Sequence, residues 1–181
     1  QSGPTLIVLA EHKPPVYAKT GLSLFTSKVR RPPPEILNAK IHHANLLNSI
    51  LAKIEANKAG ADDALMLDTR GFLAETNATH LFIVRKDEVA TSRVIACPEG
   101  ITRATVLEIC ATEKIPCTET DLTLDDVYRA DEAFCTGTMG ELAAVTKVDS
   151  CVIGHGKVGP MTGRLSEVFV QRTASEGVEV A

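Results

Sequence analysis

No apolar run in this 181-residue sequence approaches the ~20 residues that a membrane-spanning helix requires. Basic side chains are not in excess either, because 19 Lys and Arg stand against 23 Asp and Glu, for a net charge of −4. Such a chain has no general electrostatic attraction to nucleic acid or to an anionic membrane, so we expect a small-molecule partner. The content of 44% hydrophobic and 23% charged residues excludes long disorder, collagen and coiled coil.

The cysteines contain no CxxC pair, and their number is odd. They are Cys97, Cys110, Cys117, Cys135 and Cys151. An odd number at irregular spacing argues against a disulfide framework, and a reduced thiol among apolar neighbours behaves as a small hydrophobe. The cysteine pattern therefore predicts a reducing, cytoplasmic compartment.

Common catalytic signatures are missing too. The sequence contains neither G-x-S-x-G nor the Walker A motif. The adjacent His42 and His43 point in different directions on a helix or strand, and no Cys or carboxylate stands nearby at a ligand spacing, so we predict no metal site.

Residues 154–159 match the dinucleotide-binding motif G-x-G-x-x-G. A dinucleotide site also needs a further parallel strand that carries an acidic residue about 20 positions later, and the sequence ends before such a strand could form. We expect a turn before the last helix instead.

Residue patterning predicts short strands mixed with separate helices. Runs of β-formers bounded by Gly and Pro are typical of strands, and apolar residues at helical spacing are typical of helices. The predicted strands are 5–9, 22–26, 64–67, 80–84, 133–135 and 142–145. The predicted helices are 45–59 with Asn45 as N-cap, 103–114, 124–129 and 163–172. In the first of them, an apolar stripe is expected to face the core, and it consists of Leu46, Leu47, Ile50, Leu51 and Ile54. The mixture indicates an α+β fold, or α/β of irregular topology.

Four scattered features suit a single cofactor. Gly100–Arg103 precedes a helix whose free N–H groups and dipole attract anions, and Thr136–Gly140 offers amides and hydroxyls to a phosphate or carboxylate. Glu75 lies between apolar strands, where a buried carboxylate needs a partner, and Lys40 precedes the first clear helix. Each has a plainer explanation alone: a helix cap, a loop, a structural carboxylate or a solvated lysine. Together they supply the phosphate donors, amine and ring-nitrogen partner that pyridoxal 5′-phosphate (PLP) needs.

The order of these motifs resembles the class IV (fold-type IV) aminotransferases, most closely the branched-chain and D-amino-acid aminotransferases. The segments that carry the resemblance are 30–34, 45–53, 74–79, 100–103, 137–142 and 159–165. It implies the large C-terminal cofactor-binding domain of the D-amino-acid-aminotransferase-like PLP fold, over 35–181. Residues 1–34 would be the end of a small N-terminal domain and the connector between the domains. The rest of that small domain, roughly 100 residues, is not in this sequence, and the resemblance implies a homodimer.

The resemblance also implies a reaction and roles. The reaction would be transamination between an amino acid, branched-chain L- or D-, and a 2-oxo acid such as 2-oxoglutarate. Lys40 would bind the cofactor covalently and move a proton between the substrate Cα and the cofactor, while Glu75 would hold the ring nitrogen. The phosphate-binding residues would be Ile101, Thr102 and Thr138. The backbone amides of Thr138 and Met139 would face the substrate carboxylate.

Three features depart from the family pattern. His80 stands where Asn is common, and Pro98 stands where a Leu often packs on the cofactor ring. The spacing from Lys40 to Asn45 is longer than in some relatives. Two alternatives therefore stay open: an aminodeoxychorismate lyase, which uses the same lysine and cofactor for elimination, and a non-catalytic PLP-binding remnant.

Overall fold

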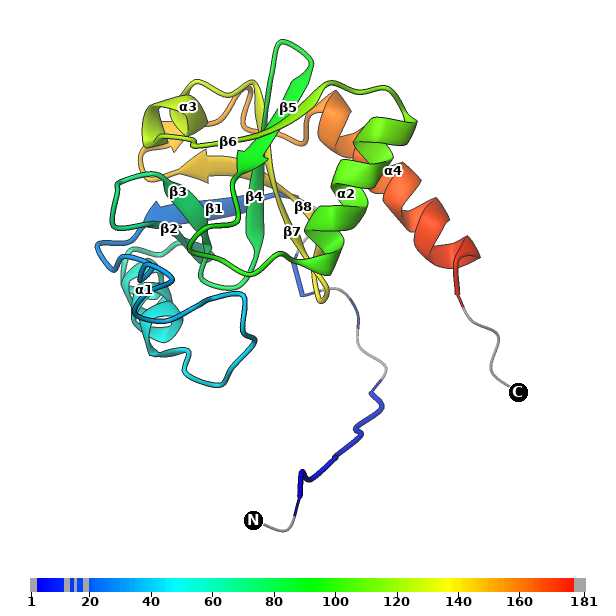
Figure 1. Cartoon of the computed structure of the whole chain (residues 1–181). Coiled ribbons are helices and arrows are strands. Elements are labelled where there is room, and N and C mark those ends of the chain that lie inside the picture. The colour runs from blue at the N-terminus through cyan, green and yellow to red at the C-terminus, as the bar shows by residue number, and fades with distance from the viewer. Residues whose placement is uncertain (1–2, 12–13, 15, 18–19, 178–181) are drawn as a thin grey trace.

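A computed structural model describes residues 3–11, 14, 16–17 and 20–177 (Figure 1). In that part of the chain, nine strands form one sheet, with four helices beside it. The strands are β1 (Leu22–Thr26), β2 (Asp63–Leu67), β3 (Leu73–Thr76), β4 (His80–Arg85), β5 (Glu88–Ser92), β6 (Cys117–Thr120), β7 (Glu132–Gly137), β8 (Glu141–Val148) and β9 (Cys151–Val152). The helices are α1 (Leu47–Lys58), α2 (Ile101–Thr112), α3 (Leu124–Tyr128) and α4 (Pro160–Ser175).

The sheet is mixed, in the order β3-β2-β1-β8-β7-β4-β5-β6, with β9 paired to β8. β1 runs parallel to both β2 and β8, and β5 runs parallel to β6, whereas the remaining pairs are antiparallel. β1 precedes residue 34 yet lies inside the sheet. Hairpins combined with separate helices confirm the predicted α+β, irregular α/β, class.

Two helices cover one side of the sheet. Figure 1 shows α2 and α4 beside each other next to β7. Their shared core with the sheet contains Phe82 and Phe134, whose rings stack with centroids 5.0 Å apart. The Glu132 carboxylate accepts hydrogen bonds from the backbone N–H groups of Met161 and Thr162, at 2.9 and 2.8 Å, and so satisfies free donors at the start of α4. None of the described helices is long and apolar enough to cross a membrane.

Helix α1 corrects the prediction for 45–59. The helix begins at Leu47, and its N-cap position is Leu46 with no side-chain cap, so Asn45 is not the cap. The buried residues are Ser49, Ala52 and Ala56, which lie against β2. The predicted apolar stripe is 42–58% exposed and consists of Leu46, Leu47, Ile50, Leu51 and Ile54. Small residues bring the helix close to the sheet, and the large apolar ones therefore face outward.

Other predicted elements have mixed outcomes. The strands at 22–26, 64–67 and 80–84 are confirmed within one residue, and the G-x-G-x-x-G segment is a turn before α4, as expected. The strand predicted at 5–9 is wrong, because those residues have no strand pairing among the described residues and extend away from the folded body (Figure 1). α2 begins at Ile101, two residues earlier than predicted, because Gly100 with φ +74° occupies the N-cap. The patterning does not predict β3, β5 or β6.

Candidate active site

Three turns that are distant in sequence meet at one end of the sheet. They are the β3–β4 turn at 77–79, the segment 97–100 before α2, and the β7–β8 turn at 138–140. His80 pairs with Thr136 across β4 and β7. A Cβ added at Gly100 would overlap the His80 ring, and one added at Gly137 would crowd the Thr79 side chain. Glycine at both positions therefore allows the turns to approach this closely.

Glu75 on β3 is a buried carboxyl with one cationic partner. It forms an ion pair with Arg31, and its other oxygen lies 4.0 Å from His80 Nε2. Burial raises the pKa of Glu75 to about 7, although the Arg31 charge acts in the opposite direction. A ligand that brings positive charge to this carboxyl would favour its ionised form.

His80 joins this carboxyl to the turn before α2. Its Nε2 lies 2.7 Å from the Pro98 carbonyl oxygen, which can only accept, so Nε2 carries the hydrogen. Burial lowers the pKa of His80 to about 4, so the ring is neutral at pH 7. The two residues that depart from the family pattern thus contact each other directly.

Glu75 and His80 give stability opposite pH dependences. The folded state holds the Glu75 proton more tightly between pH 4.5 and 7, so this group makes stability fall as the pH rises. The unfolded chain holds the His80 proton more tightly between pH 4 and 6.5, so that group makes stability rise. We expect Glu75→Gln to gain about 3 kcal/mol relative to the wild type as the pH rises from 4.5 to 7, measured by urea unfolding. A constant difference across this range would contradict the buried, protonated carboxyl.

Helix α2 presents an uncapped N-terminus at this end of the sheet. Gly100 is the N-cap, and no side chain accepts from the first turn. Ile101 is exposed and Thr102 is buried. The first N–H groups of such a helix are free to bind an anion, and the helix dipole favours negative charge there. The predicted phosphate-binding pair therefore stands at a suitable place, but Thr102 is not the cap.

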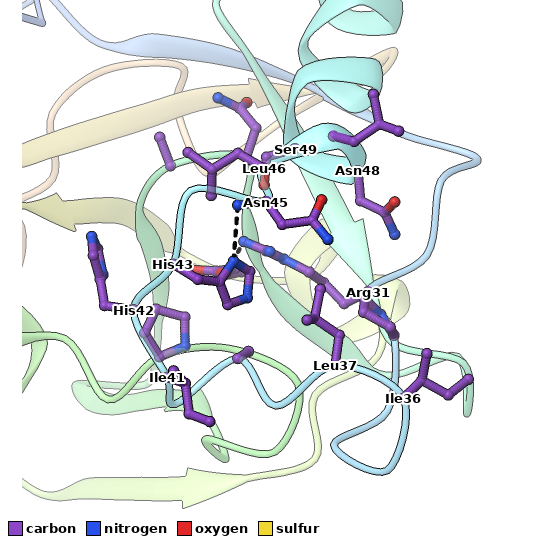
Figure 2. Close-up of a pocket in the computed structure, with 17 residues that line it drawn as sticks. Arg31, Ile36, Leu37, Ile41, His42, His43, Asn45, Leu46, Asn48 and Ser49 are labelled. Atoms are coloured by element: carbon purple, nitrogen blue, oxygen red, sulfur yellow. Dashed lines mark hydrogen bonds and ion pairs between the residues drawn. The ribbon is translucent and has the colours of Figure 1, made fainter. Parts of the chain in front are cut away.

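Lys40 lies in the loop between β1 and α1, half exposed, with its Nζ 3.4 Å from Glu99 Oε1. Ion pairs between exposed side chains contribute little, so the amine is readily released. A pocket of about 570 Å³ is lined by Glu75, Pro98 and the two neighbours of Lys40, Ala39 and Ile41. Figure 2 shows the Arg31 side chain extending into this pocket.

The remaining predicted site residues stand apart from this pocket. Thr138 and Met139 are exposed on the β7–β8 turn and do not line it. The lining does not include Lys40, Ile101 or Thr102 either. His42 and His43 do line it, but His43 Nδ1 accepts from the Asn45 backbone N–H at 3.2 Å. Within the described residues, no group of three or more His, Cys, Asp or Glu side chains is placed to hold a metal ion.

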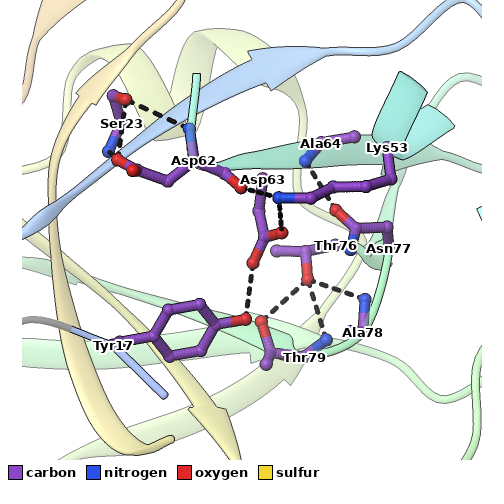
Figure 3. Close-up of polar contacts among 10 residues, drawn as sticks. All are labelled: Tyr17, Ser23, Lys53, Asp62, Asp63, Ala64, Thr76, Asn77, Ala78 and Thr79. Atoms are coloured by element: carbon purple, nitrogen blue, oxygen red, sulfur yellow. Dashed lines mark hydrogen bonds and ion pairs between the residues drawn. The ribbon is translucent and has the colours of Figure 1, made fainter. Parts of the chain in front are cut away.

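Sequence reasoning missed the contacts that tie the N-terminal segment to the site. The Tyr17 hydroxyl donates to Asp63 Oδ2 at 2.5 Å, and Lys53 Nζ lies 2.9 Å from Asp63 Oδ1 (Figure 3). The Val16 N–H donates to the Met139 carbonyl at 2.9 Å. Burial and the Asp63 hydrogen bond raise the pKa of Tyr17. The sequence carries no signal for these long-range contacts.

Comparison with known proteins decides the family. A family model described as "Amino-transferase class IV" matches residues 1–148. The chain belongs to the class IV aminotransferases. It is 52% identical over 179 residues to "Branched-chain-amino-acid aminotransferase-like protein 2" of Arabidopsis thaliana, covering 98% of this chain and 32% of that protein. It is 40% identical over 139 residues to the branched-chain-amino-acid aminotransferase of Pseudomonas aeruginosa, covering 71% and 45%.

Solved structures confirm the fold of this class IV aminotransferase chain. The branched-chain amino acid aminotransferase from Thermobaculum terrenum, in its PLP-form, superposes with a TM-score of 0.83 at 30% identity, over 88% of this chain and 53% of that one. The Escherichia coli branched-chain amino acid aminotransferase gives 0.82 at 28% identity, over 84% and 51%. The chain therefore spans about half of these solved relatives and about a third of the Arabidopsis protein.

The residues present fit the cofactor that class IV aminotransferases use, PLP. Four buried side-chain atoms have no hydrogen-bond partner within the described residues, namely Arg31 Nε, Ser92 Oγ, Arg103 Nε and Thr136 Oγ1, and the Arg31 and Thr136 atoms lie beside this site. Thr136 pairs with His80 in the sheet, and Arg31 contacts Glu75. Buried polar groups are normally hydrogen-bonded, so unpaired ones beside an uncapped helix and a buried carboxyl suit a polar ligand.

Proposed function

We propose that this chain is the PLP-binding part of an aminotransferase that moves an amino group between a branched-chain amino acid and a 2-oxo acid such as 2-oxoglutarate. The observation that carries the proposal is Glu75, a buried carboxyl paired with Arg31 at the wall of a pocket beside Lys40. A carboxyl in that position suits a protonated ring nitrogen. The names of the relatives support the reaction class.

Each residue then has a defined task. Bound PLP supplies an electron sink that acidifies the substrate Cα–H. Glu75, oriented by Arg31, holds the proton on the ring nitrogen. The amide groups at the start of α2 and the Thr138 hydroxyl would hold the phosphate, and the Thr138 and Met139 amides would face the substrate carboxylate. Lys40 would hold the cofactor through its amine and would take the proton from the substrate Cα as the general base.

The pocket wall supports an apolar substrate side chain. Besides its polar groups, the lining includes Ile36, Leu37, Ile41, Leu46 and Leu47. An aliphatic lining favours a branched hydrocarbon side chain through burial of apolar area. We therefore place L-leucine, L-isoleucine and L-valine ahead of acidic or small D-amino acids as donors.

A half-reaction assay tests this function. The chain loaded with PLP is mixed with L-leucine, with D-alanine or with aminodeoxychorismate, and the cofactor absorbance and products are followed. The proposal predicts pyridoxamine 5′-phosphate and 4-methyl-2-oxopentanoate from L-leucine, and regeneration of PLP by 2-oxoglutarate. Release of pyruvate from aminodeoxychorismate alone would indicate the lyase. No product from any donor would indicate a remnant that binds PLP without catalysis, provided that the chain joined to the small domain of a class IV aminotransferase is inactive too.

We also propose that the chain forms a homodimer. Outside the pocket, the stripe on α1 leaves Ile50, Leu51 and Ile54 between 42 and 53% exposed, and large apolar patches of this kind mark interaction sites. We expect Ile50→Lys to shift sedimentation from dimer to monomer, while Lys58→Glu in the last turn of α1 leaves the dimer intact. A wild-type monomer at tens of micromolar would contradict this proposal.

The boundary between the two domains at residue 34 and the cytoplasmic compartment stay predictions.

A further inference from the structure

We propose that His80 is a positioning residue, which fixes the 97–100 turn to the sheet and thereby aims the phosphate-binding start of α2. The inference rests on the proposed function and assigns a task within the same site to a residue that does not touch the reacting atoms.

His80 stands on hydrogen-bonded sheet backbone, whereas the turn at 97–99 has no regular backbone pairing within the described residues. His80 begins β4, which pairs with β7 on one side and β5 on the other. Within the described residues, no backbone–backbone hydrogen bond involves 97–99. The 2.7 Å contact from His80 Nε2 to the Pro98 carbonyl therefore connects an irregular segment to a paired strand.

The His80 ring contacts the 97–100 turn at two points. Besides the Pro98 carbonyl, it packs against Gly100 so closely that a Cβ there would overlap it. Gly100 is the N-cap of α2 with φ +74°, a conformation that favours glycine. Fixing Pro98 and Gly100 sets the direction of the N–H groups of the next residues, Ile101 and Thr102, which have no side-chain cap.

The surroundings of His80 keep its imidazole ring neutral. His80 lies near two cations, Arg31 and Arg103, and near the Glu75 carboxyl, and both cations and burial favour its neutral form. A neutral imidazole donates to the Pro98 carbonyl without adding positive charge beside the Arg31–Glu75 pair. That pair stays available for the ring nitrogen, while the turn is held by an uncharged hydrogen bond.

Two variants separate the hydrogen bond from the bulk of the side chain. In His80→Gln the amide nitrogen lies about as far from Cα as Nε2 does and can donate to Pro98, whereas in His80→Asn it is too short to reach. We expect His80→Asn to bind PLP on the order of tenfold more weakly, but to bind pyridoxal, which lacks the phosphate, as the wild type does. We expect His80→Gln to restore most of the PLP affinity. His155→Asn, on an exposed turn, is the matched control.

A second measurement needs no PLP. Inorganic phosphate is titrated into labelled protein, and amide shifts of Ile101 and Thr102 are followed by NMR. We expect saturable shifts in the wild type and His80→Gln, and weakened ones in His80→Asn. If the wild type binds no PLP yet shows this phosphate pattern, the proposed function falls and the role of His80 stands.

The inference is overturned in three ways. His80→Asn with wild-type affinity for both PLP and phosphate would show that the turn needs no anchor. Equal loss of PLP and pyridoxal binding, together with a lowered melting temperature, would show a purely structural role. A wild type that binds neither PLP nor phosphate would overturn this inference and the proposed function together.

Discussion

Glu75→Gln is expected to bind PLP and yet to slow the half-reaction with L-leucine by about a hundredfold or more, the size of effect seen when one preorganised electrostatic contact is removed. An amide is neutral and cannot keep the ring nitrogen protonated, so the electron sink weakens. Glutamine still accepts from Arg31, which keeps the local packing. The Glu75 carboxyl is hard to replace, because it is buried and forms an ion pair with Arg31.

Single-turnover absorbance measures the rate for Glu75→Gln. Glu88→Gln, an exposed residue on β5, is the control for a lost carboxylate and should match the wild type. PLP affinity is measured in parallel, so that slow chemistry is distinguished from poor loading. A Glu75→Gln rate within about threefold of the wild type would make Glu75 a structural residue only.

Lys40→Met is expected to lose the covalent bond to the cofactor and to slow the half-reaction by on the order of a thousandfold, the range for a missing general base. The folded state should hardly change, because Lys40 is half exposed and its partner Glu99 is more exposed still. A melting temperature close to that of the wild type would show that the loss is chemical.

Lys157→Met tests whether the effect belongs to Lys40. Lys157 is exposed in the loop before α4, and its replacement should change neither rate nor cofactor absorbance. Ammonia or methylamine added to Lys40→Met should recover part of the rate, because a free amine can replace the missing base. Full activity in Lys40→Met would contradict the assigned role.

Local sequence predicted the strands that have a clear local pattern. The strands at 22–26, 64–67 and 80–84 are apolar runs with clear ends, and the structure contains all three. The strand predicted at 5–9 has the same composition but no pairing partner among the described residues. The apolar stripe of α1 was expected to face the core, whereas Ala52 and Ala56 do so, because close helix–sheet packing favours small side chains.

The sequence motifs indicated candidate site residues, but not the contacts that these residues make in the folded chain. The motifs indicated Glu75 and the start of α2, which the structure shows as a buried carboxyl paired with Arg31 and a helix start without a side-chain cap, and their roles toward a cofactor stay predictions. The partner of Glu75 is Arg31, 44 residues earlier, and no periodicity links the two. The contact of His80 with Pro98 likewise depends on how β4 faces an irregular turn, which only the folded sheet determines.

Reduction of the PLP-loaded chain with borohydride, followed by peptide mapping, tests the central claim most directly. Borohydride fixes the cofactor to whichever amine holds it, so the label reports the residue without requiring turnover. We expect one pyridoxyl group per chain, on Lys40. A label on Lys53 or Lys157, or no label at saturating PLP, would contradict it.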